Sequence, residues 1–181
     1  GNRTTEITHD AGGDIVRVQE RAFDELSRLI TSLGAVSQTT RFSYDKNDNL
    51  EFIEDALGRQ TTLSFDALDR LIKITDALQG ESTFSYDTSN NLTSVTDAEG
   101  VMTTFEYDGH RNLLKEISTA RGTTTYNFDA AGNRTDSSDA NGVLSTMAYD
   151  ALNRLTHITY RASPDENIEY SYDQGEDSIG Q

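Results

Sequence analysis

The stretch that decides the fold is Phe128-Asp129-Ala130-Ala131-Gly132-Asn133-Arg134-Thr135, because it returns as Tyr149-Asp150-Ala151-Leu152-Asn153-Arg154-Leu155-Thr156. Each copy opens with an aromatic residue followed by Asp, and the same pair recurs along most of the chain. Successive pairs lie 21 residues apart, except for the last one, which follows after 23 residues. A fixed period of this length indicates an array of repeats. The pairs are Phe23-Asp24, Tyr44-Asp45, Phe65-Asp66, Tyr86-Asp87, Tyr107-Asp108, Phe128-Asp129, Tyr149-Asp150 and Tyr172-Asp173.

Further columns of similar residues keep the same register. Five positions after the aromatic residue only Arg or Asn occurs, from Arg28 to Arg154. Six positions after it, six of the first seven units have Leu, and Arg134 is the one exception. The leucines are Leu29, Leu50, Leu71, Leu92, Leu113 and Leu155.

Each unit predicts two short strands and two turns. Alternation in Thr83-Phe84-Ser85-Tyr86 places the two aromatic residues on one face of a strand. A second run follows the aspartate turn, and in it Leu92 and Val95 lie three apart, which predicts a β-bulge. Asn141-Gly142 marks the second turn and favours the positive backbone angles of a tight hairpin. The fold class is therefore all-β.

One segment allows a different interpretation. Apolar residues in the range 14–33 fall near helical spacing, and Gly34 is a residue type that ends helices. Similar spacing occurs between Phe65 and Ile74, inside a unit whose register is certain, so we expect strands here too. The predicted organisation is an irregular partial repeat over 1–22, the repeat array over 23–171, and the start of a further truncated repeat over 172–181.

Composition narrows the classes of function. Only 34% of the residues are apolar and there is no Trp, which is a poor supply for a thick core. The formal net charge of −16 repels phosphate backbones, so we expect no nucleic-acid partner. Absence of cysteine excludes disulfides and thiolate metal sites. No apolar run approaches the roughly 20 residues that span a bilayer, so membrane insertion is not expected. Both ends fall inside a repeat unit, which suggests a fragment of a longer protein.

The pattern of aromatic-Asp, a short turn, Asn-Arg-Leu-Thr and Thr-Asp-Ala-x-Gly resembles the RHS/YD-repeat family over nearly the whole chain. That family includes bacterial toxin complexes, polymorphic toxins, wall-associated proteins and teneurins. The resemblance implies tandem β-hairpin repeats that form a curved, spiralling antiparallel sheet, here part of a shell. It also implies a secreted or cell-surface bacterial protein.

The resemblance implies a structural role rather than an enzymatic one. The expected function is a stretch of shell or surface rod, enclosing a C-terminal toxin, with the neighbouring repeats of the parent protein as partners. Carbohydrate binding or adhesion is the first alternative, with glycans stacking on the aromatic columns, and a calcium-stabilised scaffold is the second. We expect no cofactor and neither catalytic nor metal residues, since no nucleophile–base arrangement or metal-ligand spacing stands out. Edge strands of the terminal units predict self-association.

The aspartate column is the sharpest polar feature. The structural interpretation is an Asx-type turn, in which each carboxylate accepts hydrogen bonds from backbone N–H groups of the turn that follows. Pairing with the Arg or Asn four residues later would add to it. The functional interpretation is calcium binding by Asp45-Lys46-Asn47-Asp48-Asn49 and by Asp136-Ser137-Ser138-Asp139-Ala140-Asn141-Gly142, where oxygen ligands alternate. Both segments lack the bidentate Glu of an EF-hand loop.

Overall fold

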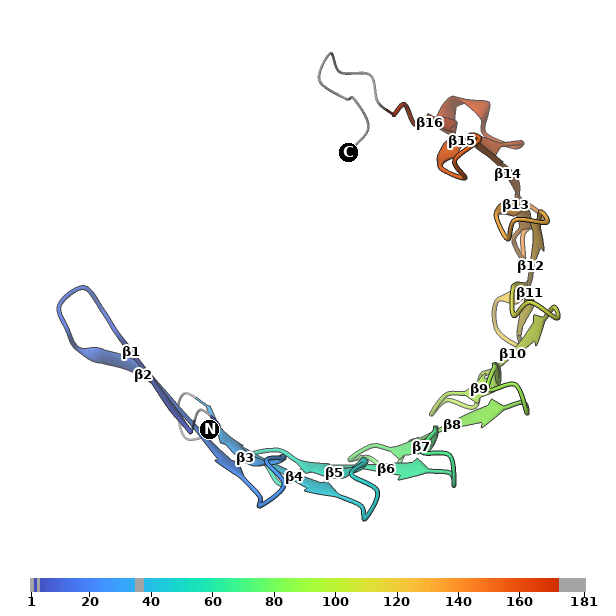
Figure 1. The fold of residues 1–181 in the computed structure, drawn as a ribbon. Helices are drawn as coiled ribbons and strands as arrows, with labels where there is room; N and C mark the ends of the chain where they lie inside the picture. The colour runs from blue at the N-terminus through green and yellow to red at the C-terminus, as the bar shows by residue number, and fades with distance from the viewer. Residues whose placement is uncertain (1, 3, 35–37, 173–181) are drawn as a thin grey trace. The chain divides into compact units, whose positions relative to one another are not determined.

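The computed structural model describes residues 2, 4–34 and 38–172, and within them the fold is almost entirely β. The chain divides into two compact units, one over 1–84 and 97–99 and the other over 85–96 and 100–181. The strand order of the antiparallel sheet is the order of the strands in the chain, so consecutive strands are hydrogen-bonded neighbours. Figure 1 shows this succession of hairpins from β1 to β16.

The first unit is a run of antiparallel hairpins. Strands pair with their chain neighbours from β1 to β8. Its strands are β1 (Thr5–His9), β2 (Ile15–Phe23), β3 (Leu29–Leu33), β4 (Thr39–Tyr44), β5 (Leu50–Glu54), β6 (Gln60–Phe65), β7 (Leu71–Thr75) and β8 (Glu81–Tyr86), whose last two residues belong to the second unit.

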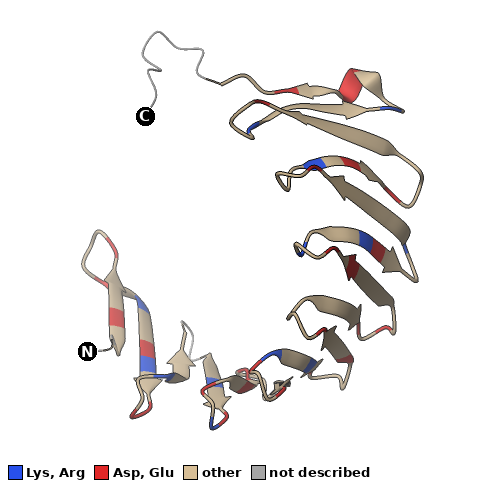
Figure 2. Ribbon diagram, turned by 45° about the vertical axis from the view of Figure 1, so that its right-hand side comes forward, with Lys and Arg blue, Asp and Glu red and all other residues tan. Residues whose placement is uncertain are grey.

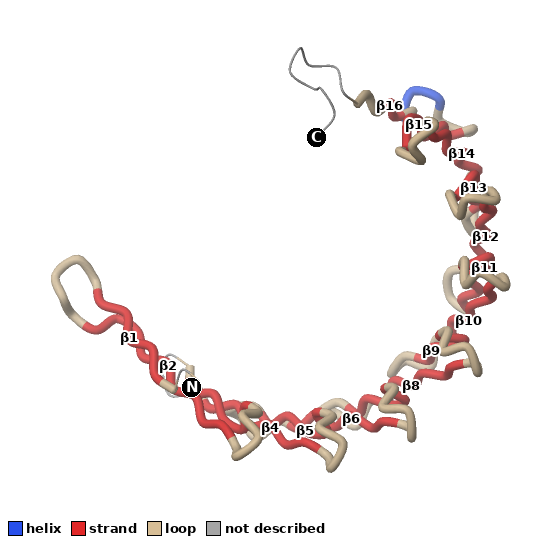
Figure 3. The backbone as a smooth tube through the Cα atoms, in the orientation of Figure 1, coloured by secondary structure: helices blue, strands red, loops and turns tan. Residues whose placement is uncertain are grey.

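The second unit continues the same pattern. Its one short helix, η2 (Pro164–Glu166), follows β15 (Figure 3). Its strands are β9 (Leu92–Thr96), β10 (Met102–Tyr107), β11 (Leu113–Ser118), β12 (Gly122–Phe128), β13 (Arg134–Ser138), β14 (Leu144–Tyr149), β15 (Leu155–Tyr160) and β16 (Ile168–Glu169).

The segment with helical spacing forms strands, as preferred from the repeat register. Residues 15–23 form β2 and residues 29–33 form β3, joined by a turn at Asp24. Among the described residues, no helix is long and apolar enough to cross a membrane.

The predicted bulge is present after the aspartate turns. Tyr44 pairs with Leu50 whereas Ser43 pairs with Phe52, so Glu51 is the extra residue. The same shift occurs at the aromatic residue in the other hairpins whose register is known. The bulge explains why apolar residues three apart, rather than two, share the aromatic face.

No apolar side chain is fully buried in the described part of the chain. The most buried residues are instead three small hydroxyl residues, Thr103, Ser118 and Ser145, on the aromatic face. The aromatic residues of the repeats are half-buried by their neighbours, apart from the more exposed Tyr170 and Tyr172. The sheet is thus a single layer whose stability comes from contacts between adjacent strands and turns.

Candidate functional site

The turn that begins at an aromatic–Asp pair, here called the signature turn, has the same backbone hydrogen bonds at all seven pairs whose turns the structure describes. In the first, the Asp24 N–H donates to the Arg28 carbonyl (3.0 Å) and the Ser27 N–H donates to the Asp24 carbonyl (3.0 Å). Ser27 has a φ of 67°, so the turn is a three-residue loop closed by a left-handed residue. The left-handed positions are Ser27, Asp48, Asp69, Asn90, Arg111, Gly132 and Asn153.

The aspartate of each signature turn holds the loop with its carboxylate. At Asp66, Oδ1 accepts hydrogen bonds from the N–H groups of Leu68 (2.9 Å) and Arg70 (3.1 Å), while Oδ2 accepts one from the Arg70 Nε (2.7 Å). The predicted Asx-type turn and its pairing with Arg or Asn are therefore confirmed at this residue. The same three bonds occur at Asp24, Asp45, Asp87, Asp108, Asp129 and Asp150.

These bonds favour the ionised carboxylate. The side-chain hydrogen bond from Arg70 lowers the pKa of Asp66, and the one from Asn133 lowers the pKa of Asp129. The eighth aspartate, Asp173, lies outside the described residues. The other aspartates of this column therefore act as charged acceptors that close the turns.

Side chains five positions after the aromatic residue also reach the next signature turn. Asn49 Nδ2 donates to Asp69 Oδ1 (2.8 Å), and Asn133 Nδ2 donates to Asn153 Oδ1 (2.9 Å). The Arg28 guanidinium contacts the Asp48 carboxylate in the same way. In these three cases the acceptor is the left-handed residue, so each bond links one repeat to the next.

The tyrosines of the repeats form a second link between neighbours. The Tyr44 hydroxyl donates to the Leu29 carbonyl (2.9 Å), and the Tyr149 hydroxyl donates to the Arg134 carbonyl (3.0 Å). Leu29 precedes the first β3 residue that pairs with β4, and Arg134 precedes the first β13 residue that pairs with β14, so neither carbonyl lies in those ladders. The Arg28 guanidinium lies 4.7 Å from the centre of the Tyr44 ring. The aromatic residue thus spans the gap where adjacent hairpins separate.

The segments with alternating oxygen ligands do not form a metal cluster. No group of three or more His, Cys, Asp or Glu side chains within the described ranges is arranged to hold a metal ion. Asp139 Oδ1 accepts hydrogen bonds from the N–H groups of Asn141 and Val143, and Asp136 Oδ1 accepts one from Asn127. Carboxylate oxygens in these loops therefore serve the protein's own donors (Figure 2 marks the acidic residues in red).

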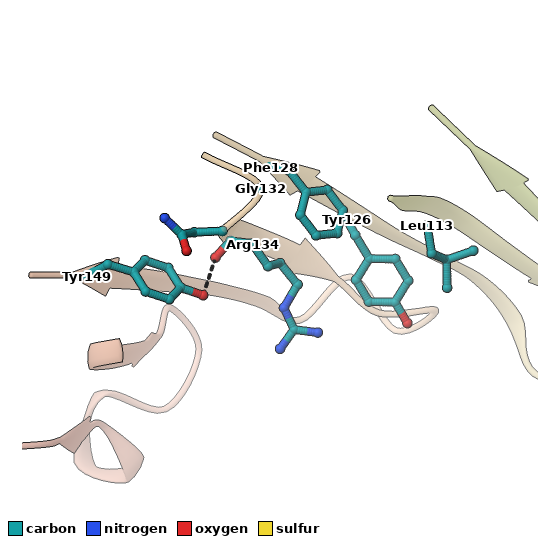
Figure 4. Close-up of a pocket in the computed structure, with 7 residues that line it drawn as sticks. Leu113, Tyr126, Phe128, Gly132, Arg134 and Tyr149 are labelled. Atoms are coloured by element: carbon teal, nitrogen blue, oxygen red, sulfur yellow. Dashed lines mark hydrogen bonds between the residues drawn. The ribbon is translucent and has the colours of Figure 1, made fainter. Parts of the chain in front are cut away.

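A groove on the aromatic face of the second unit surrounds the exception in the leucine column, Arg134. The groove has a volume of about 560 Å³ and is lined by Leu113, Tyr126, Phe128, Tyr149 and residues 132–134. Figure 4 shows the Arg134 side chain extending between the rings of Tyr126 and Tyr149. The guanidinium lies 5.6 Å from the centre of the Tyr126 ring, and its Nε donates to the Met147 sulfur (3.3 Å). Arg134 itself is exposed.

Sequence reasoning found the columns but missed two of their consequences. It noted Arg134 only as an exception, although a charged residue in an apolar column is a signal of a special site. It also passed over a column of hydroxyl residues four positions before the aromatic one, which supplies two of the three most buried residues. That column contains Thr40, Thr61, Ser82, Thr103, Thr124 and Ser145.

Comparison with known families gives one match. The RHS Repeat family model matches residues 53–81, 86–124 and 128–166, which together make up more than half of the chain. No curated protein sequence matches the chain.

Solved structures show the same fold at low sequence identity. The TcdB2-TccC3-Cdc42 structure matches with a TM-score of 0.70 and 17% identity, over 86% of this chain and 10% of that chain. The Tc holotoxin pore of Photorhabdus luminescens matches with a TM-score of 0.69 and 15% identity, over 84% and 9%. TcdB2-TccC3 without its hypervariable C-terminal region matches with a TM-score of 0.66 and 16% identity, over 87% and 10%. The chain thus spans about a tenth of the length of the structures it matches.

Proposed function

Because the chain belongs to the RHS repeat family, we propose that it is a structural module rather than an enzyme, and that it forms a stretch of wall in a larger secreted bacterial protein. Support comes from the way the repeats are joined. Ladder pairing, the turn-to-turn bonds of Asn49 and Asn133, and the hydroxyl bonds of Tyr44 and Tyr149 all connect one repeat to its neighbour. Because every repeat can be joined to the next by the same links, adding repeats enlarges the sheet.

The single observation that carries the proposal is the absence of any buried apolar side chain among the described residues. A catalytic domain of this size normally encloses a core that fixes its site. In this chain the side chains instead link neighbouring strands, so the fold is a sheet with two accessible faces. A single-layered sheet of this kind is suited to form a wall.

Enclosure of a toxic segment is the finer part of the proposal. It is favoured by the fold that the chain shares with the TcdB2-TccC3 structures and with the Tc holotoxin pore. A rod on the cell surface is the other arrangement that the same repeats could build. Glycan binding on the aromatic columns stays a prediction.

Protease protection tests enclosure in the full-length protein that carries this chain. We expect the segment that follows the repeats to resist protease in the wild type and to become sensitive when Asp45→Ala, Asp66→Ala and Asp150→Ala are combined. Leu57→Ser with Leu78→Ser is the matched control, because these two side chains are 79% and 91% exposed and hold no repeat together. Equal cleavage in the wild type and the triple variant would contradict enclosure.

Self-association through edge strands belongs to the same proposal. In the described chain β1 pairs on one side only, with β2, and four of its five residues are exposed. We expect sedimentation to show concentration-dependent association, and an Ile7→Lys substitution, which places a charge on this edge strand, to reduce it. A monomer at high concentration would contradict this part.

A further inference from the structure

Arg134 stands where the other units of the array have leucine. It pairs with Phe128 across the β12–β13 ladder, just as Leu155 pairs with Tyr149 in the following hairpin. The register therefore places the Arg134 side chain on the aromatic face, at a position that elsewhere holds an apolar group. A guanidinium in this place can pair with an anion, which the leucine of the other units cannot do.

The described residues supply no anionic partner for this guanidinium. Within the described residues Arg134 makes no salt bridge, and its recorded side-chain contacts are with Met147 and Tyr126. The nearest acidic residue along the strand, Asp136, pairs with Asn127 on the opposite face, and its two oxygens accept hydrogen bonds from Asn127 and Thr135 rather than from Arg134. In contrast, Arg28, Arg70 and Arg154 each pair with the aspartate four residues before.

The remaining groups of the groove fit one anionic group flanked by apolar surface. Tyr126, Phe128 and Leu113 provide ring and aliphatic walls. The Tyr126 hydroxyl makes no hydrogen bond in the described part of the chain, so it is a second donor near Arg134 (Figure 4). The guanidinium fork matches the geometry of a carboxylate.

Few other hydrogen-bonding groups are left for a ligand. The Asn133 amide donates to Asp129 and to Asn153, and the Tyr149 hydroxyl donates to the Arg134 carbonyl. A sugar carries many hydroxyl groups that need such partners, whereas a peptide side chain needs only one charged contact and an apolar surface. The groove therefore favours a polypeptide over a saccharide.

We infer that this groove, here called the Arg134 groove, binds a polypeptide segment in which an Asp or Glu stands next to an aromatic or aliphatic residue. The carboxylate pairs with the Arg134 guanidinium and accepts the Tyr126 hydroxyl proton in a hydrogen bond. The adjacent apolar side chain lies against Phe128 and Leu113. This inference concerns residues 85–172 alone and does not depend on enclosure of a toxin.

The test uses the chain of residues 1–181, which has no Trp and so contributes no tryptophan fluorescence. The probe is the acetylated and amidated tetrapeptide Ser-Glu-Trp-Ser, and its anisotropy reports binding directly. A second probe, Ser-Gln-Trp-Ser, has the same size without the charge. We expect the Glu peptide to bind about tenfold more tightly than the Gln peptide, and the difference to shrink with added salt.

Two variants separate the groove from general charge attraction. Arg134→Leu restores the residue of the other repeats, so it keeps the fold, and it should abolish the difference between the two peptides. Arg161→Leu is the matched control, because it removes the same charge from an exposed residue of the second unit, and it should preserve the difference. Unfolding curves verify that both variants are folded.

Several results would overturn the inference. Equal affinity of the wild type for the two peptides, or no binding of either at millimolar concentration, excludes a carboxylate site. If Arg134→Leu and Arg161→Leu reduce the affinity difference between the two peptides equally, the difference comes from net charge and not from the groove. Displacement of the Glu peptide by free glucuronate at lower concentration than by free Ser-Glu-Phe-Ser assigns the groove to acidic sugars instead.

Discussion

The signature turn at Asp66 and the second turn at Asp76 follow one another in the chain and have the same backbone hydrogen bonds. In each, the Asp N–H donates to the carbonyl four residues later, and a left-handed residue, Asp69 or Gln79, donates its N–H to the Asp carbonyl. Both aspartates accept two backbone N–H groups with Oδ1. Only Asp66 also receives a side chain, that of Arg70.

The two turns differ in what their left-handed residue does. Asp69 accepts hydrogen bonds from Asn47 and Asn49 of the preceding signature turn, whereas Gln79 accepts none from a neighbouring repeat in the described chain. A left-handed conformation is strained for a residue with a side chain, and Asp69 offsets that strain with its bonds. Identical backbone geometry thus serves two purposes: closing a hairpin in one turn, and also joining repeats in the other.

The largest expected effect comes from removing the signature aspartate. Asp66→Ala loses the hydrogen bonds from two backbone N–H groups and the Arg70 pair, whereas Asp76→Ala loses the bonds from two backbone N–H groups only. We expect Asp66→Ala to lower the melting temperature by several degrees and Asp76→Ala to lower it less. Calorimetry checks the ranking, and an equal fall in the two variants would show that the Arg70 pair contributes nothing.

Acid should weaken the signature turns next. The pKa values of Asp24, Asp66 and Asp150 are lowered from 3.8, so the folded state binds fewer protons than the unfolded state in this range. Stability from these groups is fully present above pH 3.8 and is lost as the pH falls through their lower folded values. Denaturant unfolding recorded from neutral pH down to about pH 2.5 should show a steady loss of stability as these carboxylates take up protons.

The control for this acid effect replaces the titrating groups. Asp24→Asn, Asp66→Asn and Asp150→Asn together should flatten the dependence in the acid range and lower stability at neutral pH. An unchanged slope would assign the acid effect to other carboxylates.

A smaller effect is expected from the tyrosine link. Tyr44→Phe removes the hydroxyl that donates to the Leu29 carbonyl and should lower the free energy of unfolding by about 1 kcal/mol. Phe65 is the aromatic residue of the next aromatic–Asp pair, so Phe65→Tyr is the reverse change and adds a hydroxyl at the equivalent position. Urea unfolding of both variants should show opposite shifts of the midpoint. Shifts of the same sign would exclude the link as their cause.

The smallest expected effect concerns the left-handed residue of the second turn. Gln79 has a φ of 67°, so Gln79→Gly should raise the free energy of unfolding by about 0.5–1 kcal/mol. Gly58 occupies the same place in the preceding second turn, and a Cβ there meets no atom within 4 Å. Gly58→Ala should therefore lose about 1 kcal/mol through backbone strain alone. Similar stabilities for both variants and the wild type would show that these loops relax freely.

The sequence was sufficient for the repeat unit because each column has a structural cause that depends on near neighbours. Asp66 bonds within its own turn, and a three-residue spacing such as that of Leu50 and Ile53 records a bulge in the same strand. The second turn was predicted less well. Asn141-Gly142 predicted positive backbone angles, but only Gly142 has one, and Asp139 closes the three-residue loop with its own carboxylate.

Features that depend on contacts between repeats could not be predicted. The spacing from Asn49 to Asp69 becomes meaningful only when the ladder brings two turns together. The same holds for Arg134, whose place among Tyr126, Phe128 and Tyr149 follows from strand register. Burial of Thr103 and Ser145 also arises from neighbouring strands, because Thr124 of the same hydroxyl column is less buried.

The sequential strand order has a consequence for how the chain reaches its structure. Because each strand pairs with the strands before and after it, contact order is low and loop-closure entropy is small at every step. Hairpins can then form one after another while the polypeptide leaves the ribosome or a secretion channel, without waiting for a distant partner. Assembly of this chain can start at any hairpin and extend to its neighbours, so its rate should be insensitive to the number of repeats still to come.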